Sequence, residues 1–433
     1  IVDRNGVVLA TNRTVCTISV IHSQIKDPQQ TADMLSKELE LDREDVLKKV
    51  EKVSSMEKIK TNVDKKTGDR IREYNLPGVK VDEDFKRYYP YDRLASRVLG
   101  FTGSDNQGII GLEVKYENWL KGRNGKILTM TDAAGVELEN AFEDREEPVP
   151  GHDLTISLDY NMQKYAMQMA EKVRQEKQAE KTAILLMNPQ NGEIYAMVNV
   201  PEFNLNRPFE LNTEEESDEN MTDEQKQDAL NQMWRNGCIN DTYEPGSTFK
   251  IITASAGLEE GVIRSTDIIH ATGVFTEAYG SPTCWIYNQY HGSHGNINMV
   301  DAIRVSCNYY FYEVGFRLGG GRSTGYSSDR ALAALSKYAA MFGFDHTSGM
   351  ELPESDPKIS DSDGIRSAIG QGTHLYTVSQ IARYVSTIAN RGTVYDLTLL
   401  DKLTDSEGNT IEDYSASVYN NIDLSLIHIS EPT

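Results

Sequence analysis

The sequence predicts an α+β protein in which helices surround an antiparallel sheet, preceded by an elongated α+β module. One observation is an apolar helical stripe, Met162 to Val173, which is followed by two apolar runs joined by a turn at 182–200. A helix followed by an antiparallel hairpin is typical of a helix-covered sheet. The other is the mixed composition of the first 150 residues. We therefore expect domains at 1–150 and 151–423, and a non-native tail at 424–433.

Residues 1–150 predict a structural or interaction module. Short β-prone runs, VVLA at 7–10 and VCTISVI at 15–21, stand beside a charged helical stretch at 31–53. Turn signals such as Asp105 to Gly108 are frequent. No cluster of catalytic residue types stands out in this block.

The second domain opens with a strand, a helix and a hairpin. LTISL at 154–158 predicts a strand, and Asp159 can cap the following helix. In that helix apolar residues from Met162 to Val173 recur at intervals of 3, 4, 7, 8 and 11, which predicts core packing rather than a cofactor site. Asn191 and Gly192 form the turn of the hairpin.

Most of the chain after residue 247 is predicted to be helical. We expect a helix from Ser247 to Leu258 that ends at Gly261, and one from Asp301 into VSCNYYFYEVG. Segments 331–343 and 377–392 predict two more, with Gly343 and Gly392 as C-terminal stops. The glycine-rich segment 319–329 predicts a mobile loop, since it lacks the strand and helix that flank a phosphate-binding loop.

Composition excludes some classes of function. The formal net charge of −22 argues against a nucleic-acid partner. Much of this charge lies in 210–228, which predicts a solvated surface insertion. No segment approaches 18 apolar residues, and the chain begins at Ile1, so we expect a piece cut from a longer protein. The missing anchor is then no evidence for a cytoplasmic protein. Cys16, Cys238, Cys284 and Cys307 form no CxxC pair and no metal-ligand pattern, which favours buried thiols over disulfides.

The clearest chemical motif is EPGSTFK, which holds Ser247 and Lys250. Pro245 and Gly246 turn the chain into an apolar helix, so Ser247 lies at a helix N-terminus that favours developing negative charge. Lys250 lies one turn later on the same face, where burial can keep its amine neutral and able to act as a base. Ser55 and Lys58 have the same spacing, but charged neighbours predict an ordinary surface.

The segment VSCNYYFYEVG contains two further candidate catalytic residues. Ser306 and Asn308 can face the same cleft while Cys307 points away. The hydroxyl can relay a proton to a leaving amine, and the amide can hold the lysine and the substrate backbone.

EPGSTFK followed by SCN resembles the transpeptidase domain of penicillin-binding proteins, the serine acyltransferases that crosslink peptidoglycan. IVDRNGVVLA, RYYPYDRLASRVLGFTG and GIIGLEVKYENWLKG are similar to the pedestal, or dimerisation, module of the class B subgroup. The resemblance continues to about residue 420. It is greatest to division and sporulation enzymes of Gram-positive bacteria, which face outward from one N-terminal membrane helix.

The resemblance assigns roles to residues. Ser247 attacks a D-Ala-D-Ala carbonyl, Lys250 takes the hydroxyl proton, and Ser306 and Asn308 manage proton return and binding. Gly370, Gln371 and Gly372 are assigned to substrate binding. The implied partners are peptidoglycan stem peptides, β-lactams as covalent inhibitors, and membrane proteins of wall synthesis or division. No metal or organic cofactor is implied.

The sequence departs from the family pattern in one respect. The family places Lys-Thr-Gly after the SCN motif, whereas this chain has that tripeptide only at 66–68, where we interpret it as coincidence. The resemblance fades near Ile422, and LSLIHISEPT at 424–433 looks like translated adapter DNA. We therefore expect the hairpin at 183–199 to keep an unpaired, apolar edge, and the 433-residue chain to bind penicillin poorly or not at all.

Two other interpretations stay open. Class D β-lactamases and β-lactam sensors share an STFK-like motif, but they carry Ser-x-Val where this chain has Ser306-Cys307-Asn308, and they lack the pedestal block. A non-catalytic division scaffold is the alternative from a different class.

Overall fold

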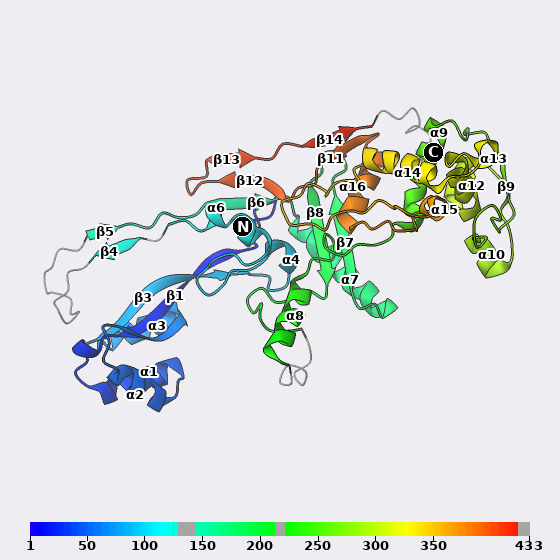
Figure 1. Cartoon of the computed structure of the whole chain (residues 1–433). Coiled ribbons are helices and arrows are strands. Elements are labelled where there is room, and N and C mark those ends of the chain that lie inside the picture. Colours follow the sequence, from blue (N-terminus) through cyan, green and yellow to red (C-terminus); the bar gives the residue numbers. More distant parts are fainter. Residues whose placement is uncertain (124, 129–143, 213–220, 423–433) are drawn as a thin grey trace.

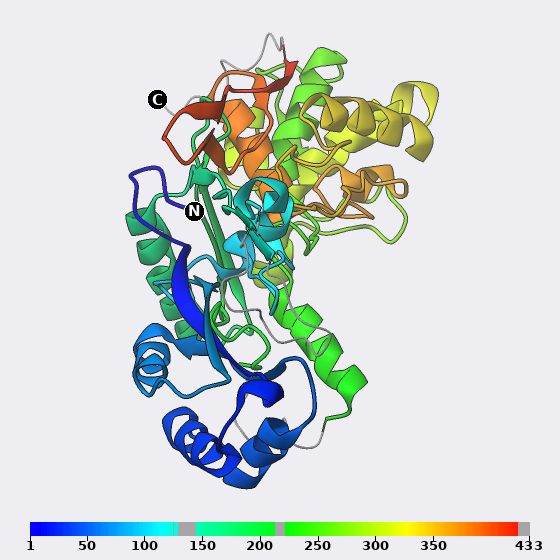
Figure 2. The same cartoon turned by 90° about the vertical axis from the view of Figure 1, so that its left-hand side faces the viewer.

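The computed structural model of the chain describes residues 1–123, 125–128, 144–212 and 221–422. Figure 1 shows an elongated molecule, with a small sheet and its helices at one end and a cluster of helices at the other. The quarter turn in Figure 2 shows the same separation of the two ends. The predicted α+β class is confirmed, because helices and antiparallel strands are mixed along the chain. The tail expected at 424–433 lies outside the described residues.

The N-terminal end is a three-stranded antiparallel sheet, in the order β2–β1–β3, whose core is shared with three helices. Its elements are β1 (Thr11–Val20), η1 (His22–Gln24), α1 (Pro28–Leu39), α2 (Arg43–Glu51), β2 (Glu57–Asp64), α3 (Lys65–Glu73) and β3 (Val79–Tyr88). The helical stretch predicted at 31–53 is divided between α1 and α2. The division arises because Glu40 adopts a left-handed φ of 53° and the Asp42 side chain caps α2.

The Lys-Thr-Gly tripeptide at 66–68 lies within α3 and serves packing. A Cβ at Gly68 would lie 2.4 Å from Cys16 Sγ, so the glycine lets α3 approach β1 closely. Cys16 is fully buried in the same core. Ser55 and Lys58 are both exposed, as expected for a surface segment.

A single hydrophobic core crosses the predicted domain boundary at residue 150. Ile1, Leu9 and Phe101 pack in the same cluster as Leu154 and Met197. Arg97 also forms an ion pair of 3.3 Å with Glu202. Residues 1–10 and 89–120 are thus joined to the second domain by a shared core. The elements here are α4 (Ser96–Leu99), α5 (Gly111–Lys115), α6 (Glu117–Leu120), β4 (Lys126–Leu128), β5 (Asp144–Glu146) and β6 (Asp153–Ile156).

The predicted helix and hairpin are present as α7 (Tyr160–Lys177), β7 (Thr182–Met187) and β8 (Ile194–Val200), and Asp159 caps α7. The predicted buried stripe of α7 is only partly correct. Met162, Tyr165 and Val173 are exposed, because α7 turns its small residues toward β8 and places Ala166 and Ala170 in the interface. Among the strands that the structure describes, β7 pairs with β8 alone, so its other edge is unpaired as predicted.

The other end of the molecule is largely helical, and its core contains residues from 249 to 422. Helix α12 packs against both α9 and α15, and Figure 1 shows these helices gathered together. The remaining helices of the described chain are α8 (Asp223–Trp234), which packs on the core shared with Ile1 and Phe101, and η2 (Gly246–Phe249), α9 (Lys250–Glu259), α10 (Trp285–Tyr290), α11 (Met299–Arg304), α12 (Asn308–Leu318), α13 (Gly321–Thr324), α14 (Ser328–Met341), α15 (Gly364–Ser367) and α16 (Val378–Ala389). The remaining strands are β9 (Ile269–Ala271), β10 (Gly295–Ile297), β11 (Thr393–Tyr395), β12 (Leu400–Thr404), β13 (Thr410–Asp413) and β14 (Val418–Asn421), of which β12 and β13 form a sheet with β6.

Two predictions for this region are wrong in detail. The helix expected from Asp301 into VSCNYYFYEVG is two helices, α11 and α12, and Asn298 rather than Asp301 caps α11. The loop predicted at 319–329 contains the short helix α13. Arg322 of α13 is ion-paired with Glu313 of α12 at 2.9 Å, which holds the segment against the helical core.

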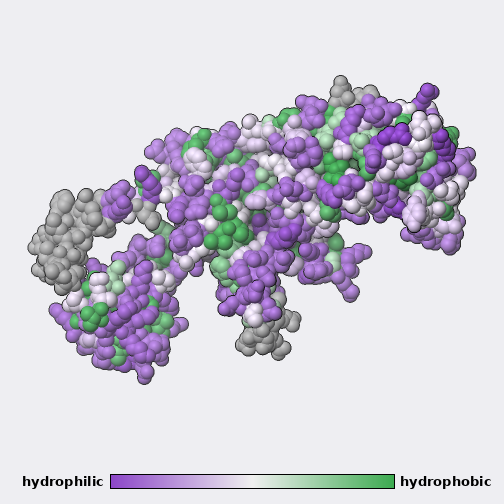
Figure 3. All heavy atoms as spheres, in the orientation of Figure 1, coloured by the Kyte–Doolittle hydropathy of each residue, from purple (hydrophilic) through white to green (hydrophobic). Residues whose placement is uncertain are grey.

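The surface in view in Figure 3 is mostly hydrophilic, with separate apolar patches. In the acidic segment 210–228, residues 213–220 lie outside the described residues, and those from Asp223 to Asp228 are exposed in the first turns of α8. Within the part of the chain that the structure describes, none of the helices combines the length and apolarity needed to cross a bilayer.

Candidate active site

The predicted serine lies where the chain turns into α9. Ser247 belongs to the 3₁₀ turn η2, and Lys250 is the first residue of α9. The side chain of Ser247 is exposed, whereas Lys250 is only 2% exposed. Phe249 between them is buried and packs on the His374 ring at 4.3 Å, which anchors the turn. An exposed hydroxyl and a buried amine therefore lie one helical turn apart.

The Lys250 amine is the centre of the site. Its Nζ atom lies 3.1 Å from Ser247 Oγ, 2.9 Å from Ser306 Oγ and 2.6 Å from Asn308 Oδ1. It also contacts the Ser306 carbonyl oxygen at 3.0 Å. All four partners are uncharged oxygens, so none of them holds the amine in its charged form as a carboxylate would. The structure thus brings the four predicted residues Ser247, Lys250, Ser306 and Asn308 together.

Ser306 reaches the amine through an unusual backbone conformation. It lies in the turn between α11 and α12 with a φ of +52°, a left-handed value that costs a non-glycine residue on the order of 1 kcal/mol. In this conformation its carbonyl and its hydroxyl both contact Lys250 Nζ. The hydroxyl also donates a hydrogen bond of 2.9 Å to Ser247 Oγ. Ser306 therefore links the Lys250 amine and the Ser247 hydroxyl directly.

Burial makes the Lys250 amine easier to deprotonate. Desolvation lowers the pKa of Lys250 to about 8, while the nearby sulfur atoms of Cys284 and Cys307 act in the opposite direction. A sizeable fraction of the amine is then neutral near physiological pH. A neutral amine has a lone pair that can accept the Ser247 proton.

Gly370, the first residue of the Gly370–Gln371–Gly372 segment, packs against the turn that carries Ser247. The Gly246 N–H donates to the Gly370 carbonyl at 2.9 Å, and a Cβ at Gly370 would lie 2.1 Å from the Gly246 carbonyl oxygen. Only glycine allows so close an approach at a φ of +75°. Gln371 is exposed. Gly370 therefore positions the turn that carries Ser247.

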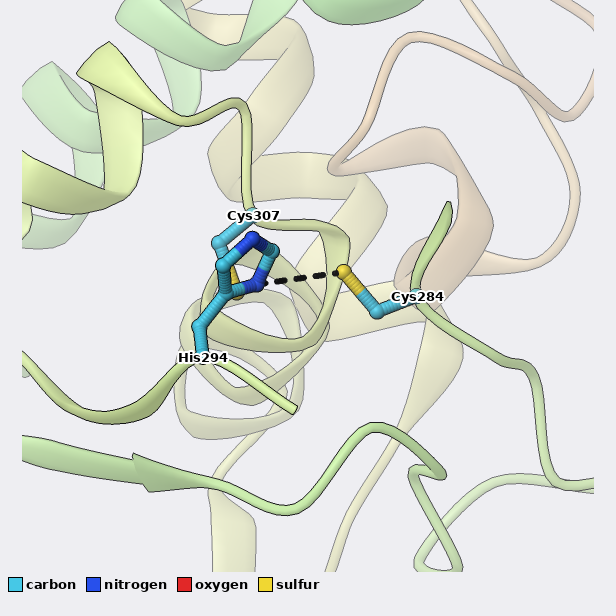
Figure 4. A group of neighbouring side chains, drawn as sticks. All are labelled: Cys284, His294 and Cys307. Carbon is cyan, nitrogen blue, oxygen red and sulfur yellow. Dashed lines mark hydrogen bonds between the residues drawn. The ribbon is translucent and has the colours of Figure 1, made fainter. Parts of the chain in front are cut away.

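A second cluster of chemical groups was missed by the sequence analysis. Cys284, His294 and Cys307 place two sulfur atoms and a ring nitrogen within 4.8 Å of one another (Figure 4). A hydrogen bond from Cys307 lowers the pKa of the Cys284 thiol below its ordinary value. Spacings of 10 and 13 residues match no common ligand pattern, so the sequence held no local signal for this cluster. The four cysteines are free thiols and buried, in agreement with the favoured interpretation.

Comparison with known proteins identifies the family. A model described as "Penicillin binding protein transpeptidase domain" matches residues 182–428, and one described as "Penicillin-binding Protein dimerisation domain" matches residues 1–156. The chain therefore belongs to the penicillin-binding proteins that carry this transpeptidase domain. The joined dimerisation domain places it in class B, as the resemblance predicts.

Curated relatives extend over nearly the whole chain. Stage V sporulation protein D of Bacillus subtilis is 32% identical over 406 residues, which cover 91% of this chain and 58% of that protein. Peptidoglycan D,D-transpeptidase MrdA of Acinetobacter baumannii is 28% identical, with 90% and 60% covered. The chain thus spans about 60% of the length of these relatives.

Solved structures agree with this fold. A penicillin-binding protein (PBP2) from Helicobacter pylori, in complex with MreC, matches with a TM-score of 0.73 and 25% identity, covering 93% of this chain and 78% of that one. Penicillin Binding Protein 2X from Streptococcus thermophilus matches with a TM-score of 0.72 at 19% identity, over 96% and 62% of the two chains. The elongated N-terminal module followed by a transpeptidase fold is therefore confirmed.

Proposed function

We propose that this protein crosslinks peptidoglycan by serine acyl transfer, as a D,D-transpeptidase. The observation that carries the proposal is the contact of one buried amine, Lys250 Nζ, with Ser247, Ser306 and Asn308 at 2.6 to 3.1 Å. A nucleophile, a base and a second hydroxyl within hydrogen-bond reach form the arrangement that acyl transfer needs. Relatives named peptidoglycan D,D-transpeptidases support the reaction class.

The first half-reaction forms an acyl-enzyme. Ser247 Oγ attacks the carbonyl carbon of the penultimate D-Ala in a stem peptide, and its proton passes to neutral Lys250 Nζ. The tetrahedral intermediate then breaks the peptide bond. Ser306 Oγ, which contacts both Lys250 and Ser247, relays the proton to the departing amine. The terminal D-Ala leaves, and the acyl group stays on Ser247 as an ester.

The second half-reaction reverses the proton path. An amine from a neighbouring stem peptide attacks the ester and gives up a proton through Ser306 to Lys250. The Lys250 proton returns to Ser247 Oγ as the ester bond breaks, so the enzyme is regenerated and a new peptide bond remains. Asn308 Oδ1 accepts a hydrogen bond from Lys250 throughout, and its amide N–H₂ group donates to the substrate backbone.

The cellular setting is part of the same proposal. The match to a stage V sporulation protein favours a role in wall synthesis during sporulation or division. A related PBP2 was solved in complex with MreC, which supports membrane-associated wall-synthesis proteins as partners. We place the catalytic domain on the outer face of the cell membrane, where its substrate is made available. Gly370, Gln371 and Gly372 would contact the bound peptide.

The proposal is tested on the full-length gene product with a peptide that ends in D-Ala-D-Ala and a D-amino acid acceptor. We expect release of D-Ala, a new acceptor-linked product, and a penicillin adduct mapped by mass spectrometry to Ser247. The matched control is Ser55→Ala, which removes the other Ser-x-x-Lys serine and leaves the adduct unchanged. An adduct that survives Ser247→Ala would reject the assignment.

The same assays separate the two rival functions. Steady turnover of nitrocefin without accumulation of an adduct would indicate a β-lactamase. Absence of both adduct and D-Ala release from the full-length protein would indicate a scaffold. The fused dimerisation domain and the Asn308 side chain on the lysine both favour the transpeptidase.

A further inference from the structure

Three side chains of types that can bind a metal ion, Cys284, His294 and Cys307, meet at the Ser306-Cys307-Asn308 turn. Cys284 precedes α10, His294 precedes β10, and Cys307 precedes α12. Figure 4 shows the Cys284 sulfur directed at the His294 ring, with Cys307 beside that ring. The three side chains therefore come from three separate segments of the chain. No sequence motif predicts that these segments meet.

The three donor atoms lie close enough together to share one ion. Cys284 Sγ lies 3.6 Å from His294 Nδ1, and the three donor atoms all lie within 4.8 Å of one another. Tetrahedral zinc, with bonds of about 2.3 Å to sulfur and about 2.0 Å to nitrogen, separates those two donors by roughly 3.5 Å. The observed distance between Cys284 Sγ and His294 Nδ1 is close to that value.

The surroundings hold the three donors in place. Both cysteine side chains are fully buried, whereas His294 is half-buried and leaves access from solvent. The Tyr310 backbone N–H donates to Cys307 Sγ at 3.5 Å, a contact that orients the sulfur. The His294 ring packs against the Trp285 ring at a centroid distance of 5.6 Å. Little rearrangement is needed for an ion to bind.

We propose that Cys284, His294 and Cys307 bind a thiophilic transition-metal ion, Zn²⁺ by the chemistry of its donors, with a water molecule in the fourth position. Two sulfur ligands and one imidazole suit zinc rather than magnesium or calcium, which prefer oxygen ligands. Binding replaces the thiol protons by the ion. Because Cys307 lies between Ser306 and Asn308, a bound ion fastens the catalytic turn to the segment that carries Cys284 and His294.

The experiment measures metal binding directly. The protein is purified with a phosphine reductant, stripped with a chelator and titrated with Zn²⁺, and the metal content is measured by elemental mass spectrometry. We expect about one equivalent per chain and a higher melting temperature. Co²⁺ in place of zinc should give d–d bands and a thiolate-to-cobalt charge-transfer band.

The variants test the ligand set. Cys284→Ser and Cys307→Ser should lose the bound equivalent and the charge-transfer band, and His294→Ala should weaken binding. Serine is a good cap at both helix starts, so these variants should fold, which circular dichroism verifies. His291→Asn and Cys16→Ala are the controls, since His291 is exposed three residues away and Cys16 lies in the N-terminal core. Both controls should bind zinc as the unmodified protein does.

Three outcomes would overturn the proposal. They are failure of the reduced protein to bind zinc or cobalt, retention of the metal by the two serine variants, and equal loss of the metal by the controls. A Cys284–Cys307 disulfide in the isolated protein, with no metal binding after reduction, would also overturn the proposal. Because none of these readouts uses acylation, the metal site and the transpeptidase function can fail independently.

Discussion

Lys250 Nζ lies 2.6 Å from Asn308 Oδ1, the shortest of the four contacts that the amine makes. The carboxamide oxygen takes one amine hydrogen without adding a negative charge. The amine is thereby oriented by α12 and remains able to lose its proton. An asparagine at this position thus supports a neutral base, which an aspartate of the same shape would not.

Asn308→Asp should slow acylation by penicillin without unfolding the protein. A carboxylate beside the amine raises the pKa of a lysine by roughly 1 to 3 units, which makes the neutral amine roughly 10- to 1000-fold scarcer near neutral pH. The rate should recover as the pH is raised. Asn308→Ala is the control, because it removes the hydrogen bond without adding charge. An unshifted pH profile in Asn308→Asp would show that the charge state of Lys250 does not govern the rate.

Lys250→Met should stabilise the protein at neutral pH. The pKa of Lys250 is lowered from 10.5 to about 8 in the folded state, so folding is penalised while the lysine is protonated in both states. Between pH 8 and 10.5 the unfolded chain binds more protons, and the stability of the unmodified protein rises with pH. The advantage of the methionine variant should therefore shrink by about 3 kcal/mol over that range. Urea unfolding at several pH values measures it, and a constant difference would contradict the shift.

Ser306→Gly should lose acylation and keep its stability. Removal of the hydroxyl breaks the link between Lys250 and Ser247, which should cost roughly 10²-fold or more. Glycine relieves the left-handed strain at φ +52°, so the free energy of unfolding should stay within about 1 kcal/mol. Ser306→Ala is the matched comparison and should lose the same activity but be the less stable variant. If Ser306→Ala were more stable than Ser306→Gly, the backbone at residue 306 would not be strained.

Gly370→Ala should displace the nucleophile turn. Its Cβ would fall 2.1 Å from the Gly246 carbonyl oxygen, so the turn that carries Ser247 must move. We expect a lower melting temperature together with slower acylation. Gly408→Ala is the control: its φ of +86° carries the same backbone cost of about 1 kcal/mol, but nothing lies within 4 Å of the added atom. Equal effects of the two substitutions would refute the role of the close contact.

The chemistry of the site could be predicted from local sequence, because each of its two motifs is short. The turn at Pro245 and Gly246 and the apolar helix after Lys250 predict an exposed serine and a buried amine, and the structure has both. The contact between the two motifs could not be derived from spacing, since it depends on how α12 packs against α9. The family resemblance supplied that expectation.

Features that depend on tertiary packing were not predicted. The turn at Ser306 divides one expected helix into α11 and α12. The segment VSCN contains no glycine or other residue that predicts a left-handed backbone conformation at Ser306. The apolar stripe of α7 was only partly correct: its alanines at 166 and 170 are buried against β8, whereas Met162, Tyr165 and Val173 are exposed, because the small side chains allow the closer approach. The meeting of Cys284, His294 and Cys307 depends on three loops, so it follows from the fold alone.

The rate of acylation of Ser247 by a penicillin as a function of pH tests the central claim most directly. If the neutral amine of Lys250 removes the serine proton, the single-turnover rate should rise with pH to a plateau, with a midpoint near 8. Lys250→Arg, which stays charged, should show neither the rise nor the plateau. A rate that is independent of pH between 6 and 10 in the unmodified protein, or a Lys250→Arg protein that acylates at the normal rate, would contradict this account.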